Sequence, residues 1–578
     1  MINNHPSPQF AREHFRLLNG EWQFESNINY NKINSDLSEK IIVPYCPESR
    51  LSGIGKHVSD HVMYSRLLDV SKEELQGRLV LNFGAVGHFA KVYVNGVKIG
   101  EHRGSYTPFS FDIAPYCFVG ENRITLVVTN DVGKDILSGK QSDLDHSYGC
   151  FYTRCTGIWQ SVWLENTPKT YVIATKLFPD AANGKVKAEV RVSDKGNVDV
   201  QVMFAGKVVG TASGEVSYRH TFEIDLAEKH LWDLEQGNLY DVKVSFGGDV
   251  AYFYFGLRDV CYDGYKFLLN GRSVFQRLVL DQGYYQDGIY TGSDEQYVQD
   301  INLARSLGFN GARLHQKVFD PRFLYYCDKM GYIVWGEYAS WGIHYSDLAV
   351  LGDFVSEWTE TVERDFNHPS IITWCPLNET WADHANSQRV RDPRFVEAMY
   401  FVTKTLDETR PCVDVSGGHH GRFTDLYDFH CYDKFDVLAK RVQGLADGIM
   451  DVPLLYAPGW AEEDHLRYVA GKPINASEIG GIAFSVQDKV LDDSKVAWGY
   501  TSICGEDIFV EQYKQLVSCL LQSPYVSGLC YTQLYDVEQE QNGFFTYDRK
   551  PKFSETTIQK IAQCTLQDAA IEQNNTKK

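Results

Sequence analysis

The sequence predicts a multidomain protein of the β plus α/β class, in which two β-sandwich domains precede a closed parallel barrel of strands and helices. Its 578 residues are enough for about three or four domains at roughly 150 residues each. Up to about residue 260, short strands of alternating polarity are separated by Gly, Asn and Asp. Beyond that point helical patterns and apolar strands follow one another repeatedly, which favours a closed parallel barrel over an open sheet.

The first part of the chain has the pattern of repeated β-hairpins. Residues 77–130 contain LVLNF, AKVYVNGVKIG and NRITLVVTN, and the Asn95-Gly96 pair between two alternating runs is a strong hairpin signal. Repeated hairpins with few helical patterns are typical of β-sandwiches. We expect a first sandwich over residues 1–168 and a second over 169–260, with strands AEVRVS, VDVQVMFA and YDVKVSF.

The remaining residues, 261–578, are expected to form the barrel. Ser293 and Gln296 form a capping-box pattern at the start of one predicted helix, and the strand FNGARL follows it. A second helix is predicted from Pro321 at its first position to Gly331 as its stop, followed by the strand YIVWGE. Because the chemistry of such barrels lies at the carboxyl ends of the strands, the last residues of each strand are the candidate site residues.

Composition and charge exclude several classes of function. Hydrophobic residues make up 43% and charged residues 23%, which is typical of globular chains. The formal net charge of −20 disfavours nucleic-acid binding, because that affinity rests mainly on basic charge. No run approaches the roughly 18 apolar residues that a membrane span needs. We therefore expect neither a nucleic-acid partner nor a membrane partner.

The cysteines and the first residues bear on compartment and cofactors. The 13 cysteines are odd in number and never form the CxxC pairs that a zinc site favours. Residues 1–15 are polar and contain no apolar signal-peptide core. A cytoplasmic location is the simplest expectation, although a chain trimmed of its signal would look the same. We expect no metal and no cofactor.

Polar side chains stand at the ends of most predicted barrel strands, which implies one site built from many loops. They are Asp281, His315, Glu337, Asn378, Glu379, His430, Tyr432, Glu478, Gln533 and Asp536. Glycosidic cleavage requires a neutral carboxylic acid that protonates the departing oxygen and a carboxylate that attacks or assists at the anomeric carbon. Glu379 and Glu478 are candidates for this pair. Solvated carboxylates are common in barrel loops, so their spacing alone leaves both interpretations open.

Four segments of the chain resemble glycoside hydrolase family 2. NHPSIITWCPLNE (367–379) resembles its acid/base motif at the fourth barrel strand, and INASEIGG resembles its nucleophile motif at the seventh. TGIWQSVWLE (156–165) looks like the end of the family's N-terminal domain, and CYTQLYDVEQEQNGFFTYDRKPKF (530–553) looks like its eighth strand and closing segment. The resemblance covers nearly the whole chain. It implies an N-terminal jelly-roll β-sandwich, an immunoglobulin-like β-sandwich and a C-terminal (β/α)8 TIM barrel.

The resemblance also implies a retaining glycosidase of the β-galactosidase and β-glucuronidase kind, acting on a terminal sugar. Glu379 matches the general acid/base, Glu478 matches the nucleophile, and Asn378 matches the residue that hydrogen-bonds the sugar 2-hydroxyl. In this mechanism the two carboxyl groups should lie about 5–5.5 Å apart. Glu379 should be kept protonated by its neighbour's negative charge and by partial burial. The expected partner is a carbohydrate substrate, and a homo-oligomer is left open.

Two departures from the family's pattern bear on the sugar. Where many members carry Arg-x-Ser-His-Tyr-Pro, this chain has RLHQK (313–317), in which His315 is a candidate sugar contact. Where the family's glucuronidases carry Asn-x-Lys before a glycine, Gly543 here follows Glu540 and Asn542. A glutamate beside a uronate would repel it, so we expect a neutral sugar, with a β-galactoside or related glycoside first. The alternatives are a β-glucuronidase, a β-mannosidase or a non-catalytic carbohydrate-binding protein.

Two sets of candidates have a structural explanation beside the functional one. Glu337 is either a site residue or a barrel-interior carboxylate paired with Arg313, because charges inside a barrel are normally paired. His430 and Tyr432 either line the pocket or support Glu478 by packing and hydrogen bonding.

The same holds for candidates nearer the rim of the barrel. Asp281 either grips sugar hydroxyls or makes structural hydrogen bonds, and Gln533 is a candidate sugar contact at the last strand. Trp460 either stacks on a sugar face or anchors a lid or an interface. His419 and His420 resemble a metal-ligand pair, but adjacent residues on a strand point to opposite faces, so a metal site is disfavoured.

Overall fold

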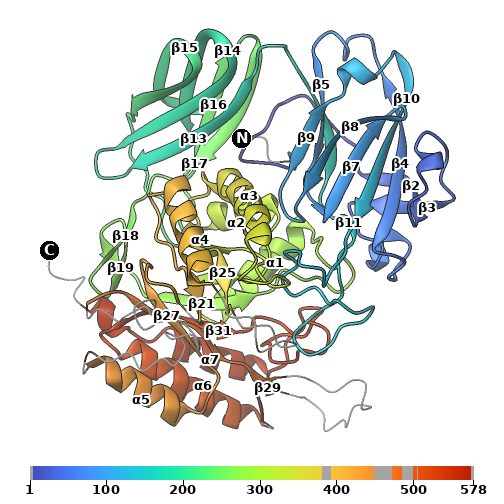
Figure 1. Cartoon of the computed structure of the whole chain (residues 1–578). Coiled ribbons are helices and arrows are strands. Elements are labelled where there is room, and N and C mark those ends of the chain that lie inside the picture. The colour runs from blue at the N-terminus through green and yellow to red at the C-terminus, as the bar shows by residue number, and fades with distance from the viewer. Residues whose placement is uncertain are drawn as a thin grey trace.

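The structure is a computed structural model, and it describes residues 4–380, 392–418, 420–446, 448, 471–484, 499–503 and 505–573. Figure 1 shows three bodies: an N-terminal β domain in blue, a second β domain in teal to green, and a larger α/β body from green to red. Both β domains lie on the same side of the α/β body in this view. The predicted order of two β domains before an α/β domain is confirmed.

The N-terminal domain packs a four-stranded antiparallel sheet, β1-β12-β5-β9, against a six-stranded one, β3-β2-β4-β10-β7-β8. A small sheet pairs β6 with β11. Asn95 and Gly96 have φ of 50° and 81° between β7 and β8, so the predicted hairpin is confirmed. The domain is the expected jelly-roll β-sandwich. The strands are β1 Phe15–Leu17, β2 Gly20–Ser26, β3 Glu39–Val43, β4 His61–Val70, β5 Arg78–Phe83, β6 Val86–Gly87, β7 Phe89–Val94, β8 Val97–Arg103, β9 Phe109–Asp112, β10 Gly120–Thr129, β11 Gly157–Ile158 and β12 Val162–Thr167.

The second domain is the expected immunoglobulin-like sandwich, built around one long strand. This strand, β14, pairs with β13 over its first half and with β16 over its second half. It also pairs with β15 along most of its length, with a register shift between Arg191 and Lys195. Alternate valines on both halves are buried in one core, as a half-buried strand of period two requires. The strands are β13 Val172–Asp180, β14 Lys185–Phe204, β15 Lys207–Asp225, β16 Tyr240–Phe246 and β17 Asp249–Phe255.

The α/β body is a parallel barrel. Seven strands form one sheet in the order β24-β23-β22-β21-β31-β28-β27, and every neighbouring pair is parallel. β25, which continues β24, pairs in parallel with β26, and β26 supplies the remaining strand position. This is the expected TIM barrel. Its strands are β21 Gln276–Asp281, β22 Gly311–Leu314, β23 Ile333–Glu337, β24 Ile371–Cys375, β25 Leu377–Asn378, β26 Val415–Ser416, β27 Tyr427–Cys431, β28 Ile474–Gly480 and β31 Val526–Thr532.

Helices cover the outside of this barrel. The capping box of Ser293 and Gln296 is present at the first helix, and the second begins at Pro321 and stops at the left-handed Gly331, so both predicted helices are confirmed. The helices are α1 Asp294–Ser306, α2 Pro321–Met330, α3 Leu348–Asp365, α4 Pro393–Leu406, α5 Phe435–Ala446, α6 Glu506–Leu521 and α7 Glu555–Thr565. Two small sheets accompany them: β18 Val260–Asp263 with β19 Lys266–Leu269 and β20 Arg272–Ser273, and β29 Ile482–Phe484 with β30 Thr501–Ile503.

One long connection links the jelly roll to the mouth of the barrel. Residues 130–156, between β10 and β11, leave the jelly roll and descend beside the barrel (Figure 1). The backbone N–H groups of Ser138 and Gly139 donate to the carbonyl oxygen of Trp341, at 2.9 and 3.2 Å. A Cβ atom added at Gly139 would lie 2.3 Å from the carbonyl oxygen of Gln316, so this close approach requires glycine. We call residues 130–156 the jelly-roll loop.

Within the described ranges, no helix is both long and apolar enough to cross a membrane.

Candidate active site

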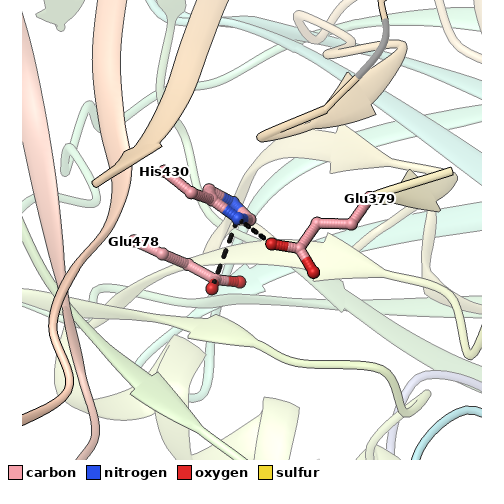
Figure 2. A group of neighbouring side chains, drawn as sticks. All are labelled: Glu379, His430 and Glu478. Carbon is pink, nitrogen blue, oxygen red and sulfur yellow. Dashed lines mark hydrogen bonds and ion pairs between the residues drawn. The ribbon is translucent and has the colours of Figure 1, made fainter. Parts of the chain in front are cut away.

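Three ionisable side chains meet at the carboxyl end of the barrel. Glu379 follows β25, His430 lies on β27 and Glu478 lies on β28. One carboxylate oxygen of each glutamate and one ring nitrogen of His430 all lie within 4.8 Å of one another. Figure 2 shows the imidazole of His430 facing both carboxylates. Its Nδ1 lies 2.5 Å from Oε1 of Glu379 and 3.3 Å from Oε2 of Glu478. The two glutamates that the sequence singles out therefore face each other.

The short contact in this group indicates a hydrogen bond and not shared metal ligation. Two ligand atoms about 2.0 Å from a tetrahedral zinc ion would lie about 3.3 Å apart. Nδ1 of His430 and Oε1 of Glu379 are 2.5 Å apart, which is closer than two such ligands sit and is typical of a charge-assisted hydrogen bond. We assign Glu379, His430 and Glu478 as a hydrogen-bonded triad.

A fully buried arginine donates hydrogen bonds to three side chains of the site. The guanidinium of Arg313, on β22, donates to Glu337, Glu478 and Asn378, each at 2.6 Å. Burial lowers the pKa of Arg313, but the charges of Glu337 and Glu478 outweigh it and leave the pKa well above its ordinary value. Arg313 is thus a permanent cation that fixes the Glu478 carboxylate in place. Of the two roles open to Glu337, pairing with Arg313 is the one that the structure supports.

A pair of stacked tyrosines forms another wall around Glu478. The hydroxyl of Tyr432 donates to Oε2 of Glu478 and lies 3.1 Å from Oγ1 of Thr532. The ring of Tyr500 stacks on that of Tyr432, with centroids 3.4 Å apart and planes 5° apart. Burial and the charge of Glu478 raise the pKa of Tyr432 well above its ordinary value, so its hydroxyl stays a donor.

Glu379 has an unusual backbone conformation, and a hydrogen-bond donor and an indole ring lie beside it. Glu379 has φ of 40°, a left-handed conformation that costs a non-glycine residue energy and is concentrated at functional sites. Asn378 is fully buried, and because its Oδ1 accepts from Arg313, its amide nitrogen Nδ2 is the free end; Nδ2 has no hydrogen-bond partner among the described residues. Nε1 of Trp341 donates to the carbonyl oxygen of Asn378 at 3.0 Å. A donor and an indole ring therefore lie next to Glu379.

The jelly-roll loop adds a buried cation. Nζ of Lys140 lies 3.5 Å from both Oε2 of Glu540 and the hydroxyl of Tyr152, and 6.0 Å from the ring centroid of Trp341. Burial lowers the pKa of Lys140, but the charge of Glu540, with smaller contributions that include Glu478, outweighs it and raises the pKa. Lys140 is therefore charged and close enough to the barrel carboxylates to interact with them.

Glu540, whose charge was expected to repel a uronate, is buried and paired. Its side chain is 1% exposed. Oε2 accepts from the Tyr152 hydroxyl, and Oε1 accepts from Nδ2 of Asn542 at 3.1 Å. With Lys140 at 3.5 Å, the negative charge of Glu540 is compensated by a cation from the other domain.

Of the remaining candidates, His315 lies beside the triad and Asp281 makes structural hydrogen bonds. His315 is buried with Nδ1 3.1 Å from Glu337 and 3.9 Å from Glu478, which places it beside the triad. Burial is the main cause that lowers its pKa well below the ordinary value, so it is neutral. Asp281 accepts from the Tyr535 hydroxyl at 2.6 Å and from the Gly283 backbone at 2.9 Å, a structural set of partners. Its role in sugar binding stays a prediction.

Other predicted residues have structural partners of their own or lie outside the described part of the chain. Oε1 of Gln533 accepts from Gln282 at 2.7 Å, and Asp536 pairs with Lys552 at 2.8 Å. His420 is buried between Asp414 and Asp428, at 2.6 and 3.0 Å, and these ion pairs account for it without a metal. Trp460 and His419 lie outside the described residues.

Several site residues were not predicted from the sequence. They are Lys140, Tyr152, Trp341 and Tyr500. Each lies in a loop without periodic polarity, and the first two belong to another domain. For Trp341 a signal was available, because it follows the strand YIVWGE by four residues and a tryptophan at such a strand end suits a sugar-binding wall.

Three family models match the chain in series. The sugar-binding domain of glycosyl hydrolases family 2 matches residues 51–168, a further family 2 domain matches 167–258, and the family's TIM barrel domain matches 264–454. Human β-glucuronidase is 26% identical over 404 residues, which cover 63% of this chain and 61% of that protein. β-Galactosidase of Thermoanaerobacterium thermosulfurigenes is 28% identical over 397 residues, 64% of this chain and 52% of that protein. The chain thus spans only about half to three-fifths of the length of these two relatives.

Solved structures of similar fold cover almost the whole chain. β-Glucuronidase of Bifidobacterium dentium, complexed with coumarin-3-O-glucuronide, superposes with a TM-score of 0.79 at 19% identity, over 97% of this chain and 99% of that one. β-Glucuronidase of Faecalibacterium prausnitzii gives a TM-score of 0.77 at 23% identity, again over 97% and 99%. At these identities the likeness shows the shared three-domain fold.

Proposed function

Because the chain belongs to glycosyl hydrolase family 2, we propose that it is a retaining exo-β-glycosidase. The observation that carries the proposal is the approach of Glu379 and Glu478, whose nearest ligand atoms lie within 4.8 Å. Retaining enzymes hold their carboxyl groups about 5–5.5 Å apart, whereas inverting enzymes leave about 6.5–9.5 Å for a water molecule. The spacing therefore supports direct attack by one carboxylate.

In the proposed reaction Glu478 attacks the anomeric carbon and Glu379 protonates the leaving oxygen. The bond from the anomeric carbon to the aglycone oxygen breaks as an ester bond to Glu478 forms, and the proton of Glu379 leaves with the aglycone. Glu379, now ionised, then takes a proton from water as that water displaces Glu478. Arg313 and Tyr432 hold the nucleophile, and the free amide nitrogen of Asn378 is placed to donate to a sugar hydroxyl.

A β-glucuronide is the glycone that the comparisons support best, in preference to the β-galactoside that the sequence favoured. The relatives include β-glucuronidases from human and Streptococcus agalactiae, the latter 24% identical over 72% of this chain and 75% of that protein. The argument against a uronate was repulsion by Glu540, and the pairing of Glu540 with Lys140 weakens it.

A neutral β-glycoside is the second candidate. When both are ionised, the Lys140–Glu540 pair carries no net charge, and a uronate has to compete with Glu540 for the ammonium group. A relative named β-galactosidase is among those that match.

A panel of p-nitrophenyl β-glycosides tests the proposal: glucuronide, galactoside, glucoside and mannoside. We expect cleavage of one of them with retention at the anomeric carbon. Glu379→Gln and Glu478→Gln should lower kcat at least about a hundredfold. Glu215→Gln is the matched control, because Glu215 is exposed on β15 and pairs only with the surface Lys195 among the described ion pairs. Inverted product, or full activity in both site variants, would overturn the proposal, and sugar binding without cleavage would make the chain a carbohydrate-binding protein.

A further inference from the structure

His430 occupies a position for which the proposed retaining reaction has no assigned role. The reaction needs one proton on Glu379 and none on Glu478. His430 lies between them, 2.5 and 3.3 Å from their oxygens (Figure 2), with 6% of its surface exposed. A titratable imidazole bridging the acid and the nucleophile affects where that proton resides.

The far side of the ring fixes which nitrogen can titrate. Nε2 lies 3.1 Å from Oγ of Ser416, whose own hydrogen is donated to Asp428 at 2.8 Å. Ser416 therefore presents a lone pair to the ring, so Nε2 carries a hydrogen and donates it. Arg313 lies further away, 3.4 Å from Nε2, and the same guanidinium nitrogen makes its short bond of 2.6 Å to Glu478. The nitrogen that gains or loses a proton is Nδ1, which faces Glu379.

Charged groups from every packed element surround the ring. Among the described residues, the carboxylates of Glu379 and Glu478 contact the ring on its Nδ1 side. Burial lowers the pKa of His430, but the charges of Glu478 and Glu379 outweigh it and raise the pKa above its ordinary value. The described groups that face it or its two carboxylates are Glu379, Glu478, Tyr432, Arg313, neutral His315, Asp428 and, from the jelly-roll loop, Lys140. From α5, Arg441 donates to the backbone carbonyl oxygen of His430 at 3.0 Å.

We propose that His430 is a positioning residue that shares the acid/base proton with Glu379, the proton moving between Nδ1 and Oε1 in the free enzyme. The proposal rests on the proposed glycosidase function. Before reaction the pair holds one proton beside the ionised Glu478. During glycosylation that proton passes from Glu379 to the aglycone oxygen, which leaves Glu379 ionised and Nδ1 bare. During hydrolysis of the glycosyl-enzyme, Glu379 takes a proton from water and the pair regains what it lost.

Two measurable consequences follow from sharing. The proton can reside on either Glu379 or His430, so the pair loses it at a higher pH than Glu379 would alone. The apparent pKa of this step belongs to the pair and not to either residue. Without His430 the basic limb of the profile of kcat/KM against pH moves to lower pH. The loss of rate near neutral pH then depends on how much the leaving group needs protonation.

The experiment compares His430→Asn and His430→Gln with wild type on dinitrophenyl and phenyl β-glycosides of the sugar that wild type cleaves. We expect the apparent pKa that defines the basic limb of kcat/KM against pH to be about one unit lower in the variants. We also expect kcat/KM at neutral pH to drop at least about tenfold for the phenyl glycoside and less than about threefold for the dinitrophenyl glycoside, which leaves without protonation. Tyr432→Phe is the comparison variant. It weakens the hold on Glu478, so both substrates should lose rate alike with no movement of the basic limb.

Equal losses on both substrates with an unmoved basic limb would make His430 merely structural and overturn the inference while leaving the glycosidase function intact. If wild type cleaves neither glycoside of any sugar, the proposed function fails and the inference falls with it.

If both variants fail to fold, an NMR titration of wild type with isotope-labelled histidine tests the inference instead. Trapping the enzyme with a 2-fluoro glycoside removes the charge of Glu478, so protonation of Nδ1 should shift to lower pH by about one unit; an unchanged titration would overturn the inference.

Discussion

Lys140 in the jelly-roll loop lies 3.5 Å from Glu540 in the barrel's closing segment, and both side chains are buried. This ion pair joins two domains across one wall of the site. Its cation comes from a loop that is anchored to the barrel by the hydrogen bonds of Ser138 and Gly139 to Trp341. The N-terminal domain therefore supplies a charged group to the candidate active site, and its docking determines the electrostatics there.

Removing the charge of Glu540 should favour an acidic sugar. In Glu540→Gln the ammonium of Lys140 has no carboxylate partner in the pair, so the local charge becomes positive. We expect the ratio of kcat/KM for the glucuronide to that for the glucoside to rise at least about tenfold. Glu538→Gln is the control, because Glu538 lies on the same segment and accepts from the Thr153 backbone instead. A ratio that moves equally in both variants would show that the Lys140–Glu540 pair does not select the glycone.

Breaking the pair from the other side should destabilise the fold. Lys140→Met leaves Glu540 buried without its cation, which costs about 3 kcal/mol of the free energy of unfolding. The double variant Lys140→Met/Glu540→Gln removes both charges and should recover most of that loss. Denaturant unfolding of the four proteins in this cycle measures the coupling. Simple additivity of the two single effects would contradict a direct ion pair.

A second interdomain contact should make stability depend on pH. Glu357, on α3, is buried 4.0 Å from His88 of the jelly roll and accepts from the Tyr338 hydroxyl at 2.5 Å. Burial raises the pKa of Glu357 to about 8, whereas burial lowers that of His88 to about 3. The folded protein thus keeps a proton on Glu357 that the unfolded chain releases near pH 4.5, so the contribution of Glu357 to stability is lost as pH rises from about 4.5 to about 8. The contribution of His88 has the opposite sign and grows up to its ordinary pKa of 6.5, so the two together lower stability only above about pH 6.5.

Glu357→Gln should remove this loss. The amide is neutral at every pH, so the variant should gain stability relative to wild type as pH rises from 5 to 8, and the two should converge at low pH. Thermal unfolding across that range, with the exposed Glu215→Gln as control, gives the two curves. Parallel curves for wild type and Glu357→Gln would mean that Glu357 is ionised in the folded protein.

The sequence predicted the fold and the two glutamates because both depend on local patterns. Asn95-Gly96, the Ser293 capping box and the helix from Pro321 to Gly331 are set by residues within a few positions of one another. Glu379 and Glu478 lie inside family motifs at strand ends. These local patterns can be recognised in the sequence without knowing how the domains pack together.

The walls of the site depend on long-range packing, which a local pattern does not encode. Lys140 and Tyr152 approach the barrel only because the jelly-roll loop docks on it. The same docking neutralises Glu540, so a charge argument made from the barrel sequence alone pointed away from a uronate. Asp281 shows the converse: a strand-end carboxylate can be satisfied by the fold itself, here through Tyr535 and Gly283.

The central claim is that Glu478 forms a covalent bond to the sugar, and trapping tests it most directly. Wild type is incubated with a 2-fluoro β-glycoside of the sugar it cleaves, then digested and analysed by mass spectrometry, with Glu379→Gln treated in parallel with a dinitrophenyl 2-fluoro glycoside that needs no acid. The account predicts one glycosyl group per chain, carried on Glu478 in both proteins. A label on Glu379, or turnover of the natural glycoside with no label on Glu478, would contradict it.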